Sequence, residues 1–294
     1  MTECVLCDVK EFSILYEGLI RKGVFGSETN ESHKVVECNG CGLKRLKDNP
    51  LTIEYYQSKE YREDYNETSE ASNYIEMHDN EQSPRLDQIG ADQFRNKAVL
   101  DYGCGGGAFL DLISGLSSST IGIEPFSGFH DSLKNRGHKV YSSKEEALGD
   151  NQNKIDTIVS FGVLEHIEDP LDYLVGARDL LKEGGKMFLE TDNFDDILLK
   201  INPNNFEKFF YRTAHLWYFQ EETLSKIARK AGFTKVTTYH RHNFDISNTI
   251  SWSKESKPTG LNKLPFFDER INRAWKDFLE SSGQADLVCV TLEK

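Results

Sequence analysis

Short apolar segments alternate with amphipathic segments along residues 84–292, and this alternation predicts strands followed by helices. The apolar run at 155–161 is almost continuous, which is typical of a parallel strand covered on both faces. Regular strand–helix alternation predicts an α/β domain with a doubly wound sheet. The expected strands are 98–102, 120–124, 138–141, 155–161, 186–190, 235–239 and 285–292, and the expected helices are 84–94, 108–115, 127–136, 170–181 and 221–231.

The first 83 residues follow a different pattern. Residues 1–47 hold few large apolar side chains, and two short strands are expected there, at 24–25 and 34–37. Residues 48–83 are polar and rich in tyrosine, with a spacing that suits helices packing one ring face on the main domain. We therefore expect a small N-terminal module (1–47), a helical linker (48–83) and a main domain (84–294). Because aromatic rings stack on sugars, the alternative is that one or two linker tyrosines face a substrate; they are Tyr55, Tyr56, Tyr61, Tyr65 and Tyr74.

A glycine-rich turn lies between the strand expected at 98–102 and the helix expected at 108–115. A turn without Cβ atoms lets a ligand lie against the backbone, and the amides that open the helix can face that ligand. A second strand ends in Glu124, about 20 residues later, where nucleoside-binding α/β domains place an acid that holds the ribose hydroxyls. The predicted nucleoside contacts are Asp101, Gly103, Gly105, Gly107, Glu124, Phe126, which would pack on adenine, and Phe161, which would line the pocket.

The spacing of the turn is D-x-G-x-G-x-G, whereas dinucleotide enzymes usually show G-x-G-x-x-G. A carboxylate beside the turn repels a pyrophosphate but suits an ammonium or a sulfonium. The turn resembles motif I of the class I S-adenosylmethionine (SAM) methyltransferases, and the resemblance continues through Glu124 and the segment 163–170. It implies a Rossmann-like, seven-stranded sheet whose last strand is antiparallel and inserted between the fifth and sixth. It also implies SAM as the cofactor, with Asp101 near the amino group of the methionine moiety.

Four of the six cysteines form two C-x-x-C pairs, Cys4 with Cys7 and Cys38 with Cys41. This spacing lets each pair of thiolates hold one side of a tetrahedral Zn²⁺. A small module with so few large apolar side chains needs a metal to hold it together, and four cysteine ligands leave no open position for catalysis. We therefore expect structural zinc in an N-terminal ribbon.

Histidines near the carboxyl ends of the expected strands are the candidate general bases, because ligands of open α/β sheets bind there. His166 follows the strand at 155–161. His215 lies within residues 193–220, which are expected to form a lid over the acceptor. Glu190 and Asp192, near the end of the fifth strand, are candidate acceptor-site carboxylates.

The ribbon, the SAM core and the H-x-x-Y-F element that begins at His215 together resemble the zinc-containing methyltransferases of deoxysugar and surface-polysaccharide pathways. Sugar C-methyltransferases of that group carry Y-H-E-H, where this chain has Arg212-Thr213-Ala214-His215. The resemblance therefore favours O-methylation of a sugar hydroxyl, on a nucleotide-linked sugar for a surface glycan. Sugar C- or N-methylation, methylation of ribosomal RNA and a non-catalytic interaction module remain as alternatives.

Composition and charge limit the classes of partner and the cellular location that we expect. The net charge is −13, so a nucleic-acid partner is not expected, because phosphate binding needs clustered lysine and arginine. No apolar run approaches the roughly 18 residues of a membrane span, and the N-terminus lacks the basic and apolar regions of a signal peptide. We therefore expect a cytoplasmic protein whose cysteines are thiols or metal ligands, acting on a small molecule. The ribbon would cover that small-molecule site or join two copies in a homodimer.

Overall fold

The computed structural model describes residues 3–24, 26–48, 53–56, 58–65, 68–257 and 263–294. Its centre is a seven-stranded sheet in the order β10-β11-β8-β7-β4-β5-β6. Neighbours from β8 to β6 pair in parallel, whereas β11 is antiparallel to both β8 and β10. The strands are β4 (Ala98–Tyr102), β5 (Ser119–Ile123), β6 (Lys139–Tyr141), β7 (Ile155–Phe161), β8 (Leu181–Asp192), β10 (Lys235–Arg241) and β11 (Leu287–Glu293).

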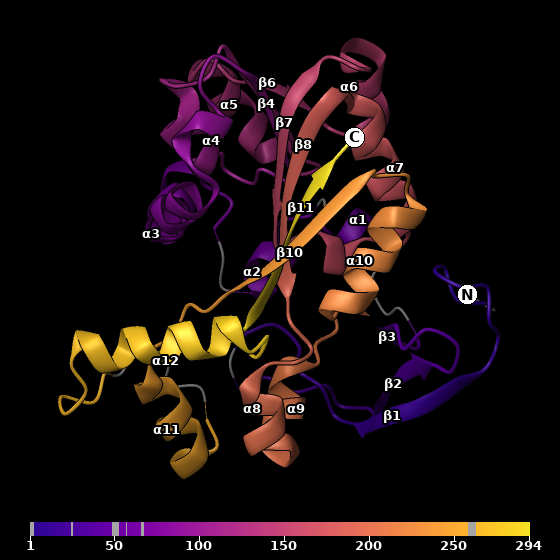
Figure 1. Cartoon of the computed structure of the whole chain (residues 1–294), viewed down its shortest axis with the longest axis vertical. Helices are drawn as coiled ribbons and strands as arrows, with labels where there is room; N and C mark the ends of the chain where they lie inside the picture. The colour runs from indigo at the N-terminus through magenta and orange to yellow at the C-terminus, as the bar shows by residue number, and fades with distance from the viewer. Residues whose placement is uncertain (1–2, 25, 49–52, 57, 66–67, 258–262) are drawn as a thin grey trace.

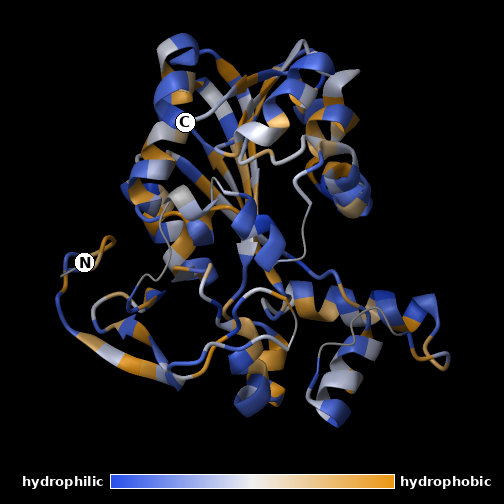
Figure 2. Ribbon diagram, turned by 180° about the vertical axis from the view of Figure 1, so that it is seen from behind, coloured by the Kyte–Doolittle hydropathy of each residue, from blue (hydrophilic) through white to orange (hydrophobic). Residues whose placement is uncertain are grey.

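Helices cover both faces of this sheet (Figure 1). One face carries α3 (Ala71–Ile89), α4 (Ala108–Ser114) and α5 (His130–Asn135), and the other carries α6 (Lys144–Asn151), α7 (Pro170–Leu180) and α10 (Glu221–Lys230). Figure 2 shows apolar residues concentrated in the central strands, as expected for strands buried on both faces. Local sequence sets the helix starts: Asp169 accepts hydrogen bonds from the amides of Leu171 and Asp172, with Pro170 at the first helical position of α7.

The N-terminal module forms a second, four-stranded antiparallel sheet in the order β1-β2-β3-β9. Its strands are β1 (Phe12–Gly18), β2 (His33–Cys38), β3 (Lys44–Leu46) and β9 (Trp217–Tyr218). The last of these strands comes from the main domain, so this smaller sheet contains strands from both the module and the main domain. The Lys230 ammonium of α10 also donates hydrogen bonds to the carbonyls of Val5 and Leu6, which fixes the first cysteine turn to the main domain.

The region before the main sheet differs from the expected one. α3 runs from Ala71 to Ile89 and contains Pro84, so the expected boundary at 84 and the helix expected at 84–94 both divide a continuous helix. Pro84 suggests a helix start because proline lacks an amide hydrogen, but the packing of α3 on α4 carries the helix through it. Two short helices, α1 (Ile53–Tyr56) and α2 (Lys59–Asp64), precede α3.

Two more expectations are corrected. Val24 lies in a bend and Phe25 lies outside the described residues, so no strand is described at 24–25, whereas β2 contains the strand expected at 34–37. The second half of the chain contains helices that the apolar pattern does not predict. They are α8 (Ile197–Ile201), α9 (Pro203–Phe210), α11 (Ile246–Glu255) and α12 (Glu269–Ser281).

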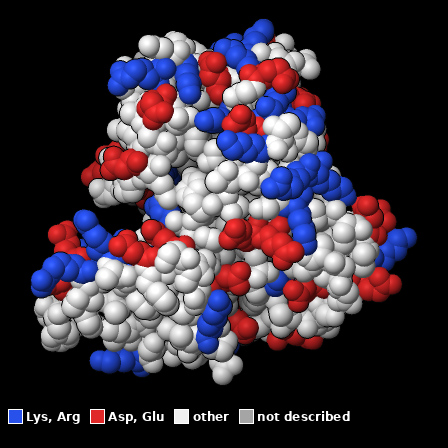
Figure 3. All heavy atoms as spheres, viewed as in Figure 1, with Lys and Arg blue, Asp and Glu red and all other residues white. Residues whose placement is uncertain are grey.

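The helices α11 and α12 lie together beyond the end of the main sheet (Figure 1), and in the space-filling view a notch separates α12 from α3 (Figure 3). On that face lysine and arginine are interspersed with aspartate and glutamate. None of the helices in the described part of the chain is both long and apolar enough to cross a membrane.

Candidate active site

The glycine turn connects β4 to α4 through left-handed backbone at Gly103, Gly105 and Gly107, whose φ values are +88°, +53° and +87°. A Cβ at Gly105 would lie 2.6 Å from the Tyr74 hydroxyl oxygen, so this side of the turn packs against α3. A Cβ at Gly107 would instead lie 2.4 Å from Cδ2 of Leu133. Gly107 therefore serves the packing of α4 against α5, and Gly105 the packing of the turn against Tyr74 of α3.

Glu124 follows β5 and is buried beside this turn. Its Oε2 accepts a hydrogen bond from the Gly105 amide at 2.9 Å, and its Oε1 accepts one from the Phe126 amide at 2.8 Å. Arg62 of α2 lies 3.5 Å from the same carboxylate. Burial raises the pKa of Glu124, and the Arg62 charge opposes that rise. The carboxylate is thus held in place by two backbone amides and Arg62, and Oε2, which accepts one of these bonds, keeps a lone pair for a further donor.

Asp101 lies in β4, in register with Gly122 and Val159, and is 4% exposed. Burial raises the pKa of Asp101 to about 7, and the positive charge of Arg85 on α3 opposes the rise. A buried carboxyl with this pKa is half ionised near neutral pH. A cation placed beside it would favour its ionised form.

Phe126 and Phe161 lie on different sides of the turn. Phe126 meets Phe129 edge-on, with ring centroids 5.0 Å apart, next to the Glu124 carboxylate. Phe161 packs edge-on against Phe109 at 5.1 Å, with the Arg85 guanidinium 4.6 Å above its ring. The structure therefore places Phe126 where a base could stack and Phe161 against the α3–α4 face.

His166 and His215 come together at the carboxyl ends of β7 and β8, with ring centroids 4.7 Å apart and planes at 89°. The His166 Nδ1 lies 2.8 Å from the Ala214 carbonyl oxygen and therefore carries the proton, which leaves Nε2 as the acceptor. The His215 Nδ1 lies 3.2 Å from Asp192 Oδ2, within ion-pair distance but without the alignment of a hydrogen bond.

The electrostatics of this cluster keep both imidazoles neutral. Burial, with the nearby charge of Arg212, lowers the pKa of His166 to about 4 and the pKa of His215 well below its usual value. Burial alone would raise the pKa of Asp192, but Arg212 and His215 hold it well below its usual range. The Arg212 guanidinium donates to Asp192 at 2.6 Å.

Glu165 completes the cluster. Its carboxylate accepts a hydrogen bond from the Thr191 hydroxyl at 2.8 Å, and burial with the Asp192 charge raises the pKa of Glu165 to about 8. The ligand atoms of Glu165, His166 and His215 lie within 4.8 Å of one another, a spacing that could hold a cation. Arg212 places a positive charge beside the same cluster, which opposes binding of a divalent ion.

Three tyrosines of the linker, Tyr56, Tyr61 and Tyr65, lie beside this cluster. The Tyr56 hydroxyl donates to the Ala214 carbonyl at 2.9 Å, and the rings of Tyr56 and Tyr61 lie 5.6 Å and 6.5 Å from the His166 ring. Tyr65 stacks at a tilt on Tyr61, 5.1 Å away. An aromatic wall of Tyr56, Tyr61 and Tyr65 therefore lies beside His166, and its signal in the sequence is the tyrosine cluster itself.

The two candidate carboxylates near the end of the fifth strand, Glu190 and Asp192, lie in different surroundings. Asp192 joins the histidine cluster, whereas Glu190 receives Arg85 on one oxygen at 2.8 Å and Arg241 on the other at 2.6 Å. Both oxygens of Glu190 are thus neutralised by arginines of α3 and β10. Sequence reasoning misses Arg62, Arg85 and Arg241 because each reaches its partner from an element distant in the chain.

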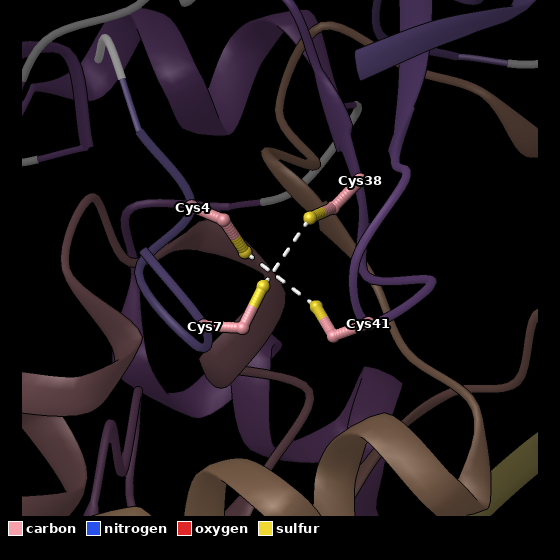
Figure 4. A group of neighbouring side chains, drawn as sticks. All are labelled: Cys4, Cys7, Cys38 and Cys41. Atoms are coloured by element: carbon pink, nitrogen blue, oxygen red, sulfur yellow. Dashed lines mark hydrogen bonds between the residues drawn. The ribbon is translucent and has the colours of Figure 1, made fainter. Parts of the chain in front are cut away.

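The four N-terminal cysteines converge. Figure 4 shows their sulfur atoms pointing toward a common centre. The sulfurs of Cys4 and Cys41 are 3.6 Å apart, those of Cys7 and Cys38 are 3.5 Å apart, and all four lie within 4.8 Å of one another. Zinc–sulfur bonds of about 2.3 Å in a tetrahedron place sulfurs about 3.8 Å apart, so this donor set fits zinc.

A family model described as a methyltransferase domain matches residues 74–238. The ubiquinone biosynthesis O-methyltransferase of Roseobacter denitrificans is 26% identical over 178 residues, which cover 57% of this chain and 70% of the relative. The same enzyme of Cereibacter sphaeroides is 28% identical over 178 residues, covering 54% and 68%.

Solved structures agree on the fold. A SAM-dependent methyltransferase from Archaeoglobus fulgidus superposes with a TM-score of 0.52 at 18% identity, covering 80% of this chain and 98% of that one. Phosphoethanolamine N-methyltransferase 2 of Haemonchus contortus, solved with SAM, superposes with a TM-score of 0.51 at 14% identity, covering 85% and 62%.

The sheet order, the glycine turn and these superpositions define a class I SAM-dependent methyltransferase fold, so the predicted seven-stranded fold is confirmed. The family model spans more than half of the sequence, and the chain therefore belongs to the methyltransferase-domain family. The prediction of an enzyme, a SAM-dependent methyltransferase, is likewise confirmed.

Proposed function

We propose that this protein is a SAM-dependent O-methyltransferase that methylates a hydroxyl of a small-molecule sugar, nucleotide-linked and destined for a surface glycan. The observation that carries the proposal is a pair of neutral histidines at the carboxyl ends of β7 and β8: His166 is half-buried, and His215 is buried beside Asp192. A hydroxyl acceptor needs a base that takes its proton, and a neutral imidazole supplies one.

The cofactor residues would be those that the structure gathers at the glycine turn. Asp101 would attract the ammonium of the methionine moiety, the Gly103 and Gly105 backbone would lie along it, and Glu124 would accept the ribose hydroxyls. Phe126 would pack on adenine. When bound, SAM supplies an activated methyl group.

His215 would act as the base and His166 would orient the acceptor. His215 would take the proton of the acceptor hydroxyl, so that the oxygen can accept the methyl group that bound SAM would supply, with S-adenosylhomocysteine as the second product. Asp192, 3.2 Å from His215 Nδ1, stabilises the imidazolium that forms. A small rotation of the ring would align this contact as a hydrogen bond.

The aromatic wall of Tyr56, Tyr61 and Tyr65 favours a sugar, because tyrosine rings stack on the apolar faces of sugars and their hydroxyls bond to ring substituents. The second candidate acceptor is the hydroxyl of a quinone precursor. The curated relatives favour it, because they are named ubiquinone biosynthesis O-methyltransferases.

Zinc would be structural. Four thiolates fill a tetrahedral shell and leave no position for a substrate, and zinc would hold the turn that Lys230 fixes to α10. Thiolate ligands of zinc suit the reducing cytoplasm, where we place the protein.

Radiolabelled SAM tests the proposal. The zinc-loaded chain is incubated with a panel of nucleotide sugars, free sugars and catechols, and the products are analysed for O-methyl groups. Transfer to a sugar hydroxyl, lost in His215→Ala but not in the exposed control Arg229→Gln, is the expected result. Transfer to catechols alone would show that the acceptor is a quinone precursor and not a sugar. Transfer to a carbon atom would contradict the proposed O-methylation.

A further inference from the structure

Lys44 of β3 is a buried lysine at the boundary between the N-terminal module and the main domain. Its side chain is 6% exposed, although a lysine is almost never buried unless it is paired. The Lys44 ammonium donates to the Gly42 carbonyl at 2.9 Å and to Oε1 of Gln220 at 2.5 Å. It also lies 3.0 Å from Oε1 of Glu37. An ammonium has three N–H donors, so these three partners together hold it in one position.

Two of these partners flank the second cysteine pair of the module. Gly42 follows Cys41, and its amide donates to the Cys38 carbonyl at 2.9 Å. Glu37 precedes Cys38 and lies opposite Lys44 in the pairing of β2 with β3. Lys44 is thus fixed to the turn 38–42, which carries two of the four sulfurs that converge in Figure 4.

Lys44 also contacts both ends of the segment 193–220. Gln220 lies at one end, and Phe194, whose ring centre is 4.6 Å from the Lys44 Nζ, lies at the other. The two ends meet each other as well, because the Phe194 amide donates to the Phe219 carbonyl at 2.8 Å. Lys44 therefore holds the segment at the point where it leaves the main domain and returns to it.

Gln220 extends this contact into the main domain. Its side-chain oxygen accepts from Lys44 while its Nε2 donates to the two carboxylate oxygens of Asp195 at 3.0 Å and 2.9 Å. Its backbone amide donates to the Thr223 hydroxyl at 3.0 Å, at the start of α10. Loss of the ammonium would leave several half-buried acceptors without their donor, which costs more than the bonds themselves contribute.

We propose that Lys44 is a positioning residue for methyl transfer, which fastens both ends of the segment 193–220, and with it His215, to the cysteine turn 38–42. The proposal rests on the proposed function, in which His215 is the base. It gives the zinc-binding module the role of holding the acceptor side of the main domain in place. A lysine that served the module alone would stabilise the cysteine turn and leave the segment 193–220 unaffected.

Hydrogen–deuterium exchange, read by mass spectrometry, tests the proposal on the full zinc-loaded chain. Lys44→Met keeps the apolar stem and removes the three donors. Amides of 193–220 should then exchange about tenfold faster, as expected for a lost hydrogen bond to a charged group. The cysteine turn should stay protected, with one zinc per chain by elemental analysis. Lys44→Arg should restore part of the protection, because a charged donor remains.

Lys34→Met is the matched control, because Lys34 of β2 belongs to the same module and its ion-pair partner Glu17 also lies there. In this control the segment 193–220 should exchange as in the wild type. Gln220→Leu removes the link from the other side, so it tests the proposal even if Lys44→Met fails to fold. Because both substitutions remove the same bond, the double variant should exchange no faster than the faster single variant.

Removal of zinc by a chelator tests the link from the metal. In the wild type it should speed exchange in both the cysteine turn and the segment 193–220. In Lys44→Met it should act mainly on the cysteine turn, because the link is already broken. Unchanged exchange of 193–220 in Lys44→Met and Gln220→Leu, or the same increase in Lys34→Met, overturns the proposal. A Lys44→Met chain that loses its zinc and its protected cysteine turn also overturns it.

Methyl transfer separates this proposal from the proposed function. With the acceptor that the radiolabel assay identifies, Lys44→Met should lower kcat about 10- to 100-fold at unchanged Kd for S-adenosylhomocysteine, because the base is misplaced. If no hydroxyl is methylated but exchange of 193–220 depends on Lys44, the link stands and O-methylation falls. If Lys44→Met methylates a hydroxyl at the wild-type rate, O-methylation stands and the positioning role falls.

Discussion

Binding of S-adenosylhomocysteine should become tighter as pH rises from 6 to 7, because the ligand ammonium requires the ionised form of Asp101. Burial raises the pKa of this carboxyl to about 7, so it is protonated in most free molecules at pH 6. The ionised fraction rises from about one in eleven at pH 6 to about one half at pH 7. Affinity should follow this fraction and increase about fivefold, or about 1 kcal/mol.

Isothermal titration calorimetry measures both the affinity and the proton that Asp101 releases. In two buffers of different ionisation enthalpy, binding should release about 0.9 proton at pH 6 and about 0.5 proton at pH 7. This pH window keeps the ligand ammonium charged, since α-amino groups titrate near 7.7 to 8.0. The sign is fixed: a carboxyl whose free-state pKa is raised, and which a cation then ionises, must lose protons on binding.

Asp101→Asn isolates the effect from Glu124, the other buried acid of the site. This variant should bind more weakly at pH 7, and its affinity should no longer change between pH 6 and pH 7. An affinity in the wild-type protein that is flat over this range, or an Asp101→Asn variant that titrates like the wild type, would refute the placement of Asp101 at the ammonium.

Further predictions concern the base, the metal and a buried acid. His215→Ala should lower kcat at least about 100-fold without changing the Kd of S-adenosylhomocysteine, as steady-state rates and calorimetry will show. Cys38→Ser should lose zinc and lower Tm, whereas Cys289→Ala, outside the cluster, should keep one zinc per chain by elemental analysis. Glu165 favours the folded state below the unfolded-state pKa, and this stabilisation is lost as pH rises through about 8. Glu165→Gln should therefore flatten the fall in urea-measured stability between pH 5 and pH 8.5.

Local spacing explains why much of the site could be predicted from sequence. The turn needs left-handed backbone at several positions within a few residues, and glycine is the residue that adopts it most readily. Gly103 and Gly105 therefore predict this conformation from the sequence alone. Glu124 is close enough in the chain to return to the Gly105 amide through one helix and one strand. Each C-x-x-C pair places two of the four sulfur ligands that a tetrahedral zinc site requires.

Contacts between distant segments could not be predicted in this way. Arg62 reaches Glu124, and Arg85 reaches Glu190, from helices whose sequence gives no signal of the partner. The break expected at Pro84 fails for the same reason, because the packing of α3 on α4 outweighs a local preference. Propensity and periodicity report on neighbours in sequence, and these interactions are set by tertiary packing.

The two-residue strand β9 is another tertiary feature that could not be predicted from the sequence. A pair of residues, Trp217 and Tyr218, has no periodicity, yet it joins β3 and so makes the N-terminal module part of the main domain. The same strand lies just after His215, and the Leu46 amide bonds to the Leu216 carbonyl at 2.9 Å. Because the sheet ends beside the candidate base, loss of zinc should disturb the position of His215 as well as the fold of the module. A metal outside the active site would then affect methyl transfer through the hydrogen bonds and packing that join the module to the main domain.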